Sequence, residues 1–153
     1  MNQFLEYILP FTLEGISIAV LCGTIIGLER QLSGKPAGIR TSILICVGTY
    51  TFVVLSTVVQ GQTIDGTRVL GQVITGVGFL GAGLMFNKDG LVNGVTSAAV
   101  IWIMAGIGSL IGFTQYGAAV SLTLITVLVL TIIGVAEHKF RKLRKGVHKE
   151  EED

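Results

Sequence analysis

The stretch Val69–Phe86, VLGQVITGVGFLGAGLMF, decides the fold of this chain of 153 residues. It is apolar apart from Gln72 and Thr75 and carries no formal charge. As a helix it would be roughly 27 Å long, which is enough to cross the hydrocarbon core of a bilayer. In lipid an unmade backbone hydrogen bond costs several kcal/mol, so the stretch is expected to stay helical despite its many glycines.

The glycines of this stretch are Gly71, Gly76, Gly78, Gly81 and Gly83. Bare glycine faces let neighbouring helices approach closely in a membrane. We therefore interpret the stretch as the central packing helix of a small transmembrane bundle. Gly76-x-Gly78-x-x-Gly81 also spells the dinucleotide-binding fingerprint, but that motif needs a preceding strand and an acidic residue about 20 positions later. Here the glycines stand inside an unbroken apolar run, which favours packing.

The composition is typical of a membrane protein. Half of the residues are hydrophobic and 14% are charged, and the mean hydropathy is +0.73. A soluble domain of this length would carry more charge and shorter apolar runs. The net charge of +1 conceals a basic segment in the tail, which beside a membrane helix reads as a topology signal rather than a nucleic-acid site. The N-terminus has no basic signal region, so the first helix is expected to remain in the mature protein.

The apolar runs predict an all-α membrane protein with five transmembrane helices in one domain, residues 1–136, and a charged cytoplasmic tail, residues 137–153. Between the first two spans, Glu29–Arg40 is predicted to be a polar loop, and Asn87–Gly90 a tight turn. Asn93 or Thr96 is expected to cap the fourth helix. The fifth span has few glycines and is expected to be the most lipid-exposed. The predicted spans cover about residues 10–28, 39–59, 69–86, 95–112 and 116–135.

Basic residues predict the orientation. The first loop carries Arg30, Lys35 and Arg40, and the tail carries further basic residues, whereas the N-terminus carries none. Five spans place that loop and the tail on one side, so the positive-inside rule puts the N-terminus outside and the C-terminus in the cytoplasm. A multi-pass membrane protein is expected.

Three polar groups follow from this topology. Asp65 and Arg68 would face outward and could pair. Glu14 lies inside the first span, where it either reaches back to water or marks a functional intramembrane carboxylate. The cytoplasmic group comprises Glu29, Arg30, Arg40, Thr41 and Thr96. The residues expected to pack helices together are Gly23, Gly27, Gly76, Gly78, Gly81, Gly83 and Gly106.

Several linked motifs resemble the MgtC/SapB family of bacterial inner-membrane proteins. They are GLERQ at Gly27–Gln31, AGIRT at Ala37–Thr41, GVGFLGAG at Gly76–Gly83 and GVTSAAVIWIMAGIG at Gly94–Gly108, with Asp65 and Arg68 between them. The resemblance covers about residues 13–130. It departs at Val95 and Ser97, where the family pattern usually has Leu and Thr.

The resemblance implies a link to growth at low magnesium and to modulation of the proton-translocating ATP synthase. The family is often labelled a magnesium transporter. Many members carry a soluble C-terminal domain, whereas this chain ends within about 18 residues of its last span, so regulation lodged in that domain is not carried over.

No cofactor is expected apart from Mg²⁺, for which the candidate ligands are Glu14, Glu29 and Asp65. Mg²⁺ requires near-octahedral oxygen ligands and keeps several waters. Glu29 and Asp65 belong to opposite faces and cannot share one ion. A purely structural alternative pairs Glu29 with Arg40 and Asp65 with Arg68. The sequence shows no catalytic arrangement, so an enzyme is not expected.

Three hypotheses remain for the function. The first is a regulatory membrane protein of magnesium homeostasis that acts through helix contacts with a partner such as ATP synthase. The second is a magnesium or other cation transporter. The third is a module that binds an anion or a lipid headgroup through Arg30, Lys35 and Arg40. The lipid bilayer and further copies of the chain are expected partners, because small-residue faces also serve between subunits, and nucleic acid is not.

Overall fold

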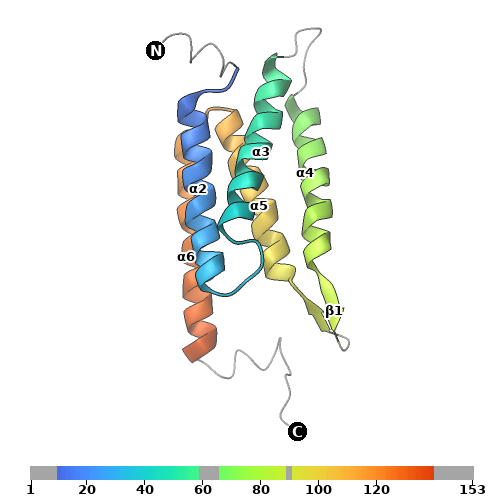
Figure 1. Ribbon diagram of the computed structural model, residues 1–153, viewed down its shortest axis with the longest axis vertical. Coiled ribbons are helices and arrows are strands. Elements are labelled where there is room, and N and C mark those ends of the chain that lie inside the picture. The colour runs from blue at the N-terminus through green and yellow to red at the C-terminus, as the bar shows by residue number, and fades with distance from the viewer. Residues whose placement is uncertain (1–9, 59–65, 89–90, 140–153) are drawn as a thin grey trace.

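The computed structural model describes residues 10–58, 66–88 and 91–139, which form a bundle of five long helices with one short hairpin (Figure 1). Within these ranges the five helices follow the predicted order. The helices are α2 (Leu13–Leu32), α3 (Ile39–Val58), α4 (Gly66–Leu84), α5 (Val95–Gly112) and α6 (Tyr116–Lys139), and the strands are β1 (Phe86–Lys88) and β2 (Leu91–Asn93).

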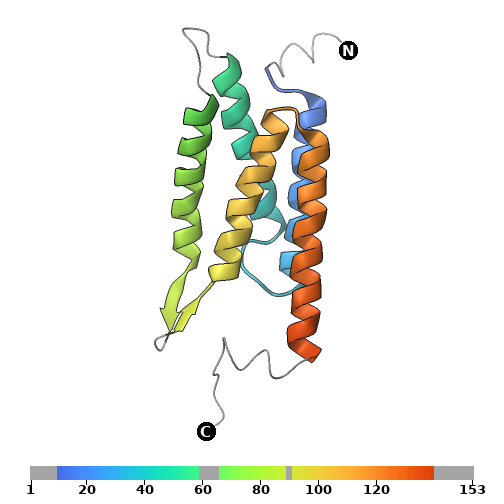
Figure 2. The same cartoon turned by 180° about the vertical axis from the view of Figure 1, so that it is seen from behind.

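Successive helices alternate in direction along the bundle. The α2–α3 loop, the hairpin and the C-terminal end of α6 lie at one end, while the start of α2 and the α5–α6 turn lie at the other (Figures 1 and 2). We call the first of these the Arg30 end. The alternation therefore gathers the first loop and the hairpin at the same end, as the five-span topology predicted.

The core lies where α2, α3 and α5 meet. The packing of α2 on α3 is closest at Gly23 and Gly27, where an added Cβ would stand 2.7 Å from the Ile43 Cα and 2.5 Å from the Ile39 Cα. Both glycines were predicted to pack, and within the chain both do. Large side chains fill the remaining core, and the largest fully buried ones are Ile26, Met104, Ile107 and Ile111.

The contact between α3 and α5 also depends on glycine. An added Cβ at Gly108 would overlap the Thr49 hydroxyl, and one at Gly112 would stand 2.5 Å from Val53 side-chain atoms. At Gly106, which was expected to pack, an added Cβ meets nothing within 4 Å. The closely packed face of α5 is therefore offset from the predicted one.

Three buried hydroxyl groups bond to the backbone of their own helix. Thr49 donates to the Ile45 carbonyl at 2.8 Å, Ser109 to Ala105 at 2.8 Å and Thr123 to Ala119 at 2.9 Å. Each bond reaches one turn back along the same helix. Such bonds let α3, α5 and α6 carry polar residues in an apolar setting, where an unmade bond would be costly.

Helix α4 lies at the edge of the bundle and packs mainly on α5, beside its contact with α3 (Figure 2). Among residues 68–84 of this helix, only Val73, Val77 and Gly81 are buried, and a Cβ added at Gly81 would stand 3.5 Å from the Ala98 Cβ. The interpretation of Val69–Phe86 as the central packing helix was wrong, because α4 has one narrow buried face. Added Cβ atoms at Gly71, Gly76, Gly78 and Gly83 meet nothing within 4 Å.

The connection from α4 to α5 is an antiparallel hairpin that pairs Phe86 with Asn93. Asn87 and Lys88 of the predicted turn belong to β1, where they pair with Val92 and Leu91, and Asp89 and Gly90 lie outside the described residues. The expected cap at Asn93 or Thr96 was wrong. The N-cap is Gly94, in the left-handed region with φ +88° and no side-chain hydrogen bond, and a Cβ there would overlap the Leu84 carbonyl.

Other predicted boundaries shift modestly. The first helix continues to Leu32 rather than ending at residue 28, so the α2–α3 loop is shorter than Glu29–Arg40. The third helix begins at Gly66 and ends at Leu84. Within the described ranges, three helices are long and apolar enough to cross a membrane, namely Ile39–Thr57, Val95–Gly112 and Tyr116–Ala136, while Arg68–Leu84 is a shorter apolar helix. Of these three helices α6 is the least buried, with 17% of its span inside the bundle, as expected for the fifth span.

Candidate functional site at the Arg30 end

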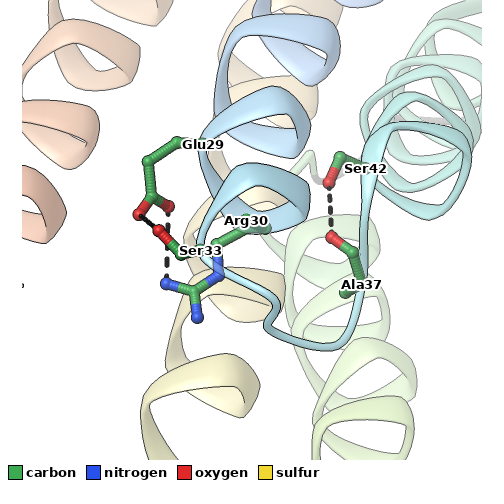
Figure 3. Close-up of polar contacts among 5 residues, drawn as sticks. All are labelled: Glu29, Arg30, Ser33, Ala37 and Ser42. Atoms are coloured by element: carbon green, nitrogen blue, oxygen red, sulfur yellow. Dashed lines mark hydrogen bonds and ion pairs between the residues drawn. The ribbon is translucent and has the colours of Figure 1, made fainter.

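Arg30 is a buried cation in the last turn of α2. Its side chain is 5% exposed, and its Nη1 lies 3.4 Å from Glu29 Oε2. The other carboxylate oxygen of Glu29 accepts a hydrogen bond from the Ser33 hydroxyl at 2.9 Å (Figure 3). The contact is long for a charge-assisted hydrogen bond, so the Glu29 carboxylate only partly compensates the buried guanidinium.

The remaining donors of Arg30 have no acceptor among the residues that the structure describes. Its Nε is buried without a hydrogen-bond partner, and no bond is formed by Nη2. A guanidinium has five N–H donors in a planar fork. The edge formed by Nε and Nη2 is therefore an unused bidentate donor.

The predicted pairing of Glu29 with Arg40 was wrong. Arg40 is exposed in the first turn of α3, whereas Glu29 pairs with its neighbour Arg30 and with Ser33. The reason is the extra turn of α2, which carries the chain past Glu29 before the loop begins. The loop is instead held by the Ser42 hydroxyl, which donates to the Ala37 carbonyl at 3.0 Å (Figure 3).

The other predicted polar residues lie apart from this pair. Thr41 and Thr96 are exposed, at the starts of α3 and α5 respectively, so both lie at the Arg30 end without a hydrogen bond to Glu29 or Arg30. Arg68 is exposed near the start of α4, at the opposite end. Its predicted partner Asp65 lies outside the described residues, so that pairing stays a prediction.

Glu14 lies in the first turn of α2 and is exposed on the protein surface. It stands fifteen positions before Glu29 on one helix, about 22 Å away along the axis. Within a single chain these two carboxylates cannot bind the same ion. No group of three or more His, Cys, Asp or Glu side chains is close enough to hold a metal within the described ranges.

A second feature is an apolar groove of about 440 Å³ between α3 and α4, floored by Ile101 of α5. Its walls leave large side chains uncovered, including Leu44 at 70% and Phe52 at 61% exposure. Gly48 opens the α3 wall, since a Cβ there would meet nothing within 4 Å. The groove is lined by Thr41, Leu44, Ile45, Gly48, Thr49, Phe52, Val77, Leu80, Leu84 and Ile101.

Sequence reasoning missed Ser33 and Gly112. Ser97, which the sequence places at the start of the fourth span, is buried at the start of α5. Ser33 stands four positions after Glu29, a spacing that brings side chains together on a helix. That signal was hidden because the helix was expected to end before Ser33.

Long apolar helices and many exposed Leu, Ile, Val and Phe side chains are typical of a helical membrane protein. The profile of the MgtC family matches residues 16–139. The chain belongs to the MgtC family, as the sequence motifs indicated.

Curated relatives support this membership. The chain is 38% identical to "Protein MgtC" of Brucella abortus (strain 2308) over 140 residues, covering 90% of this chain and 58% of the relative. It is 37% identical over 145 residues to "Putative magnesium transporter YhiD" of Escherichia coli (strain K12), covering 90% and 66% respectively. It is also 34% identical over 134 residues to "Protein MgtC" of Salmonella typhimurium (strain LT2), covering 88% and 57%.

The chain therefore spans about three fifths of the length of the curated relatives it matches. No solved structure matches it significantly.

Proposed function

We propose that this protein serves magnesium homeostasis and adaptation to low magnesium, and that it acts by contacting another membrane protein through its helices. The magnesium link is supported by family membership and by the relative of Escherichia coli that is named for magnesium transport. The mode of action is supported by one observation, the apolar groove between α3 and α4.

The groove suits a partner helix because its walls combine small and large apolar residues. Gly48 leaves room for close approach of a backbone, while Leu44, Phe52 and Leu80 offer apolar contact area. Small residues flanked by large ones are typical of helix contacts in membranes. From the family resemblance, the proton-translocating ATP synthase is the first partner to test. Self-association through the uncovered glycines of α4 is a further part of the proposal.

The proposed location is the bacterial inner membrane, with the Arg30 end in the cytoplasm. Lys35 and Arg40 are exposed at that end, and basic residues next to spans are retained on the cytoplasmic side.

A growth assay tests the proposed mode of action. Cells that lack their own copy and depend on this protein at limiting magnesium would receive Gly48→Phe, which fills the groove. Gly117→Phe on α6 is the matched control, because a Cβ at either glycine meets nothing within 4 Å. We expect Gly48→Phe to abolish growth at low magnesium and Gly117→Phe to support it. Full growth of a properly folded Gly48→Phe variant would remove the contact proposal.

Magnesium transport is the alternative mode of action, and the name of the Escherichia coli relative favours it. In one chain Glu14 and Glu29 cannot share an ion, so a transport path would need several copies with converging Glu14 carboxylates. Purified protein in liposomes under a Mg²⁺ gradient decides between the modes. Uptake that is lost in Glu14→Gln would favour transport, and absence of uptake would favour the regulatory mode.

A further inference from the structure

We infer that the Arg30 end binds a phosphate group through the guanidinium of Arg30 and the first turn of α5. This inference goes beyond the proposed role in magnesium homeostasis and does not depend on it. It rests on three observations. The guanidinium of Arg30 is buried with few hydrogen bonds, the start of α5 at the same height in the bundle has no side-chain cap, and both lie where the apolar spans end.

The cation is the primary observation. Arg30 is nine-tenths or more buried, and its Nε has no hydrogen-bond partner among the described residues. Within the same ranges its side chain forms one polar contact, from Nη1 to Glu29 Oε2, which is 3.4 Å long and leaves the Nε–Nη2 edge unused. A buried charge is costly unless it is paired and hydrogen-bonded. The edge that remains matches two oxygens of a phosphate, which is the bidentate geometry that arginine favours.

The start of α5 lies at the same level. Gly27 lies against Ile39, and Gly108 lies against Cys46 and Thr49. Because α2 and α3 are antiparallel while α3 and α5 are parallel (Figure 1), counting from these contacts sets Ser97 level with Arg30. Both residues belong to the buried faces of their helices.

The first turn of α5 offers free donors. Its N-cap Gly94 forms no side-chain cap, and the first helical bond runs from the Ala98 N–H to the Gly94 carbonyl. The N–H groups of Val95, Thr96 and Ser97 therefore lack a helical acceptor. Ser97 is a buried residue, and its hydroxyl forms no bond with any described residue. Free N–H groups and the helix dipole favour an anion at such a start.

The position of the site at the end of the apolar spans indicates which anion it would bind. The apolar spans Ile39–Thr57 and Val95–Gly112 both begin at this end, so the site lies at the depth where phospholipid phosphates meet a membrane protein. Lys35 and Arg40 are exposed nearby and add positive charge. Glu29 opposes an anion, but its carboxylate is held on the Nη1 side by Arg30 and Ser33 (Figure 3). A lipid headgroup and free phosphate share the required chemistry.

The test measures binding by the full chain purified in a neutral detergent. The probes are short-chain phosphatidic acid, inorganic phosphate and short-chain diacylglycerol, and binding is followed by native mass spectrometry and thermal shift. Arg30→Lys keeps the charge but loses the fork, and Arg40→Lys is the matched control on an exposed arginine. We expect saturable binding that is weakened by about tenfold or more in Arg30→Lys, and by less than about twofold in Arg40→Lys.

The probes separate the two sources. Binding of phosphatidic acid but not of inorganic phosphate indicates a headgroup, and binding of both indicates a general phosphate site; diacylglycerol should not bind. Should Arg30→Lys fail to fold, Ser97→Ala takes its place, with an expected loss of about threefold or more. Equal affinity of the wild type and the folded variant, or no saturable binding of either phosphate probe, would overturn the inference.

Discussion

Gly27 of α2 lies so close to α3 that a Cβ added to it would stand 2.5 Å from the Ile39 Cα. One turn earlier, Gly23 stands in the same relation to Ile43, at 2.7 Å. Backbone atoms cannot move aside as a flexible side chain can. The two helices therefore share a seam that depends on the absence of two side chains.

The first prediction tests this seam with Gly27→Ala. The added methyl would force α2 and α3 apart and lower the free energy of unfolding by about 1–3 kcal/mol. Gly76→Ala is the control, because a Cβ there meets nothing within 4 Å, and its effect should stay within about 0.5 kcal/mol. Thermal unfolding in detergent measures both. A smaller loss for Gly27→Ala than for Gly76→Ala would contradict the assigned seam.

The second prediction concerns two neighbouring glycines of α5. Gly108→Ala would drive a methyl into the Thr49 hydroxyl and toward the Cys46 carbonyl, whereas Gly106 faces open space. We expect Gly108→Ala to destabilise the protein by about 1–3 kcal/mol and Gly106→Ala to change stability by less than about 0.5 kcal/mol. Denaturant unfolding of the two variants gives the comparison. Equal losses would show that the face of α5 toward α3 is misassigned.

The third prediction concerns the start of α2. The Thr12 N–H donates to the Tyr50 hydroxyl at 3.0 Å, and the Thr12 hydroxyl accepts from the Gly15 N–H at 3.0 Å. Tyr50→Phe leaves a partly buried N–H without its acceptor and should cost about 1–2 kcal/mol of unfolding free energy. Tyr116→Phe is the control, because the Tyr116 hydroxyl bonds to no described residue, and it should cost less than about 0.5 kcal/mol.

The side chain of Thr12 extends this test. Thr12→Ala removes the N-cap and should cost about 1 kcal/mol. Since Tyr50 and Thr12 share one hydrogen-bonded unit, the double variant should lose less than the sum of the two single losses. Strict additivity would indicate that the two residues act independently.

The fourth prediction concerns topology. Lys35→Cys and Gln115→Cys place exposed thiols at opposite ends of the bundle (Figures 1 and 2). The native Cys22 and Cys46 are 1% and 0% exposed, so they should not react with a membrane-impermeant reagent. In spheroplasts we expect labelling at residue 115 only, and in inverted vesicles at residue 35 only. Labelling of both positions from one side would contradict the five-span arrangement.

The location and the pairing of Glu29 show how much of the candidate site could be predicted from the sequence. The motif around Glu29 and Arg30 indicated a polar group at one end of the bundle, and the alternation of helices places both there. The motif did not indicate that Glu29 pairs with Arg30 and Ser33, because the end of α2 was set too early. The partner of a charged side chain depends on where the helix stops, and a polar run in the sequence does not fix that residue.

The sequence by itself determined the order of the five described helices and their alternation in direction along the bundle. Long apolar runs must satisfy their own backbone hydrogen bonds, and helices do this without any information from neighbouring segments. It also determined the close packing at Gly23 and Gly27. Only the tertiary structure decided which other glycines face a neighbour: Gly108 and Gly112 do, whereas Gly76, Gly78, Gly83 and Gly106 do not. Glycine permits close approach on any side of a helix, but the position of the neighbouring helix is set by the packing of the whole bundle. That packing leaves α4 at the border of the bundle. It also buries Arg30 with two of its nitrogen donors unpaired among the described residues.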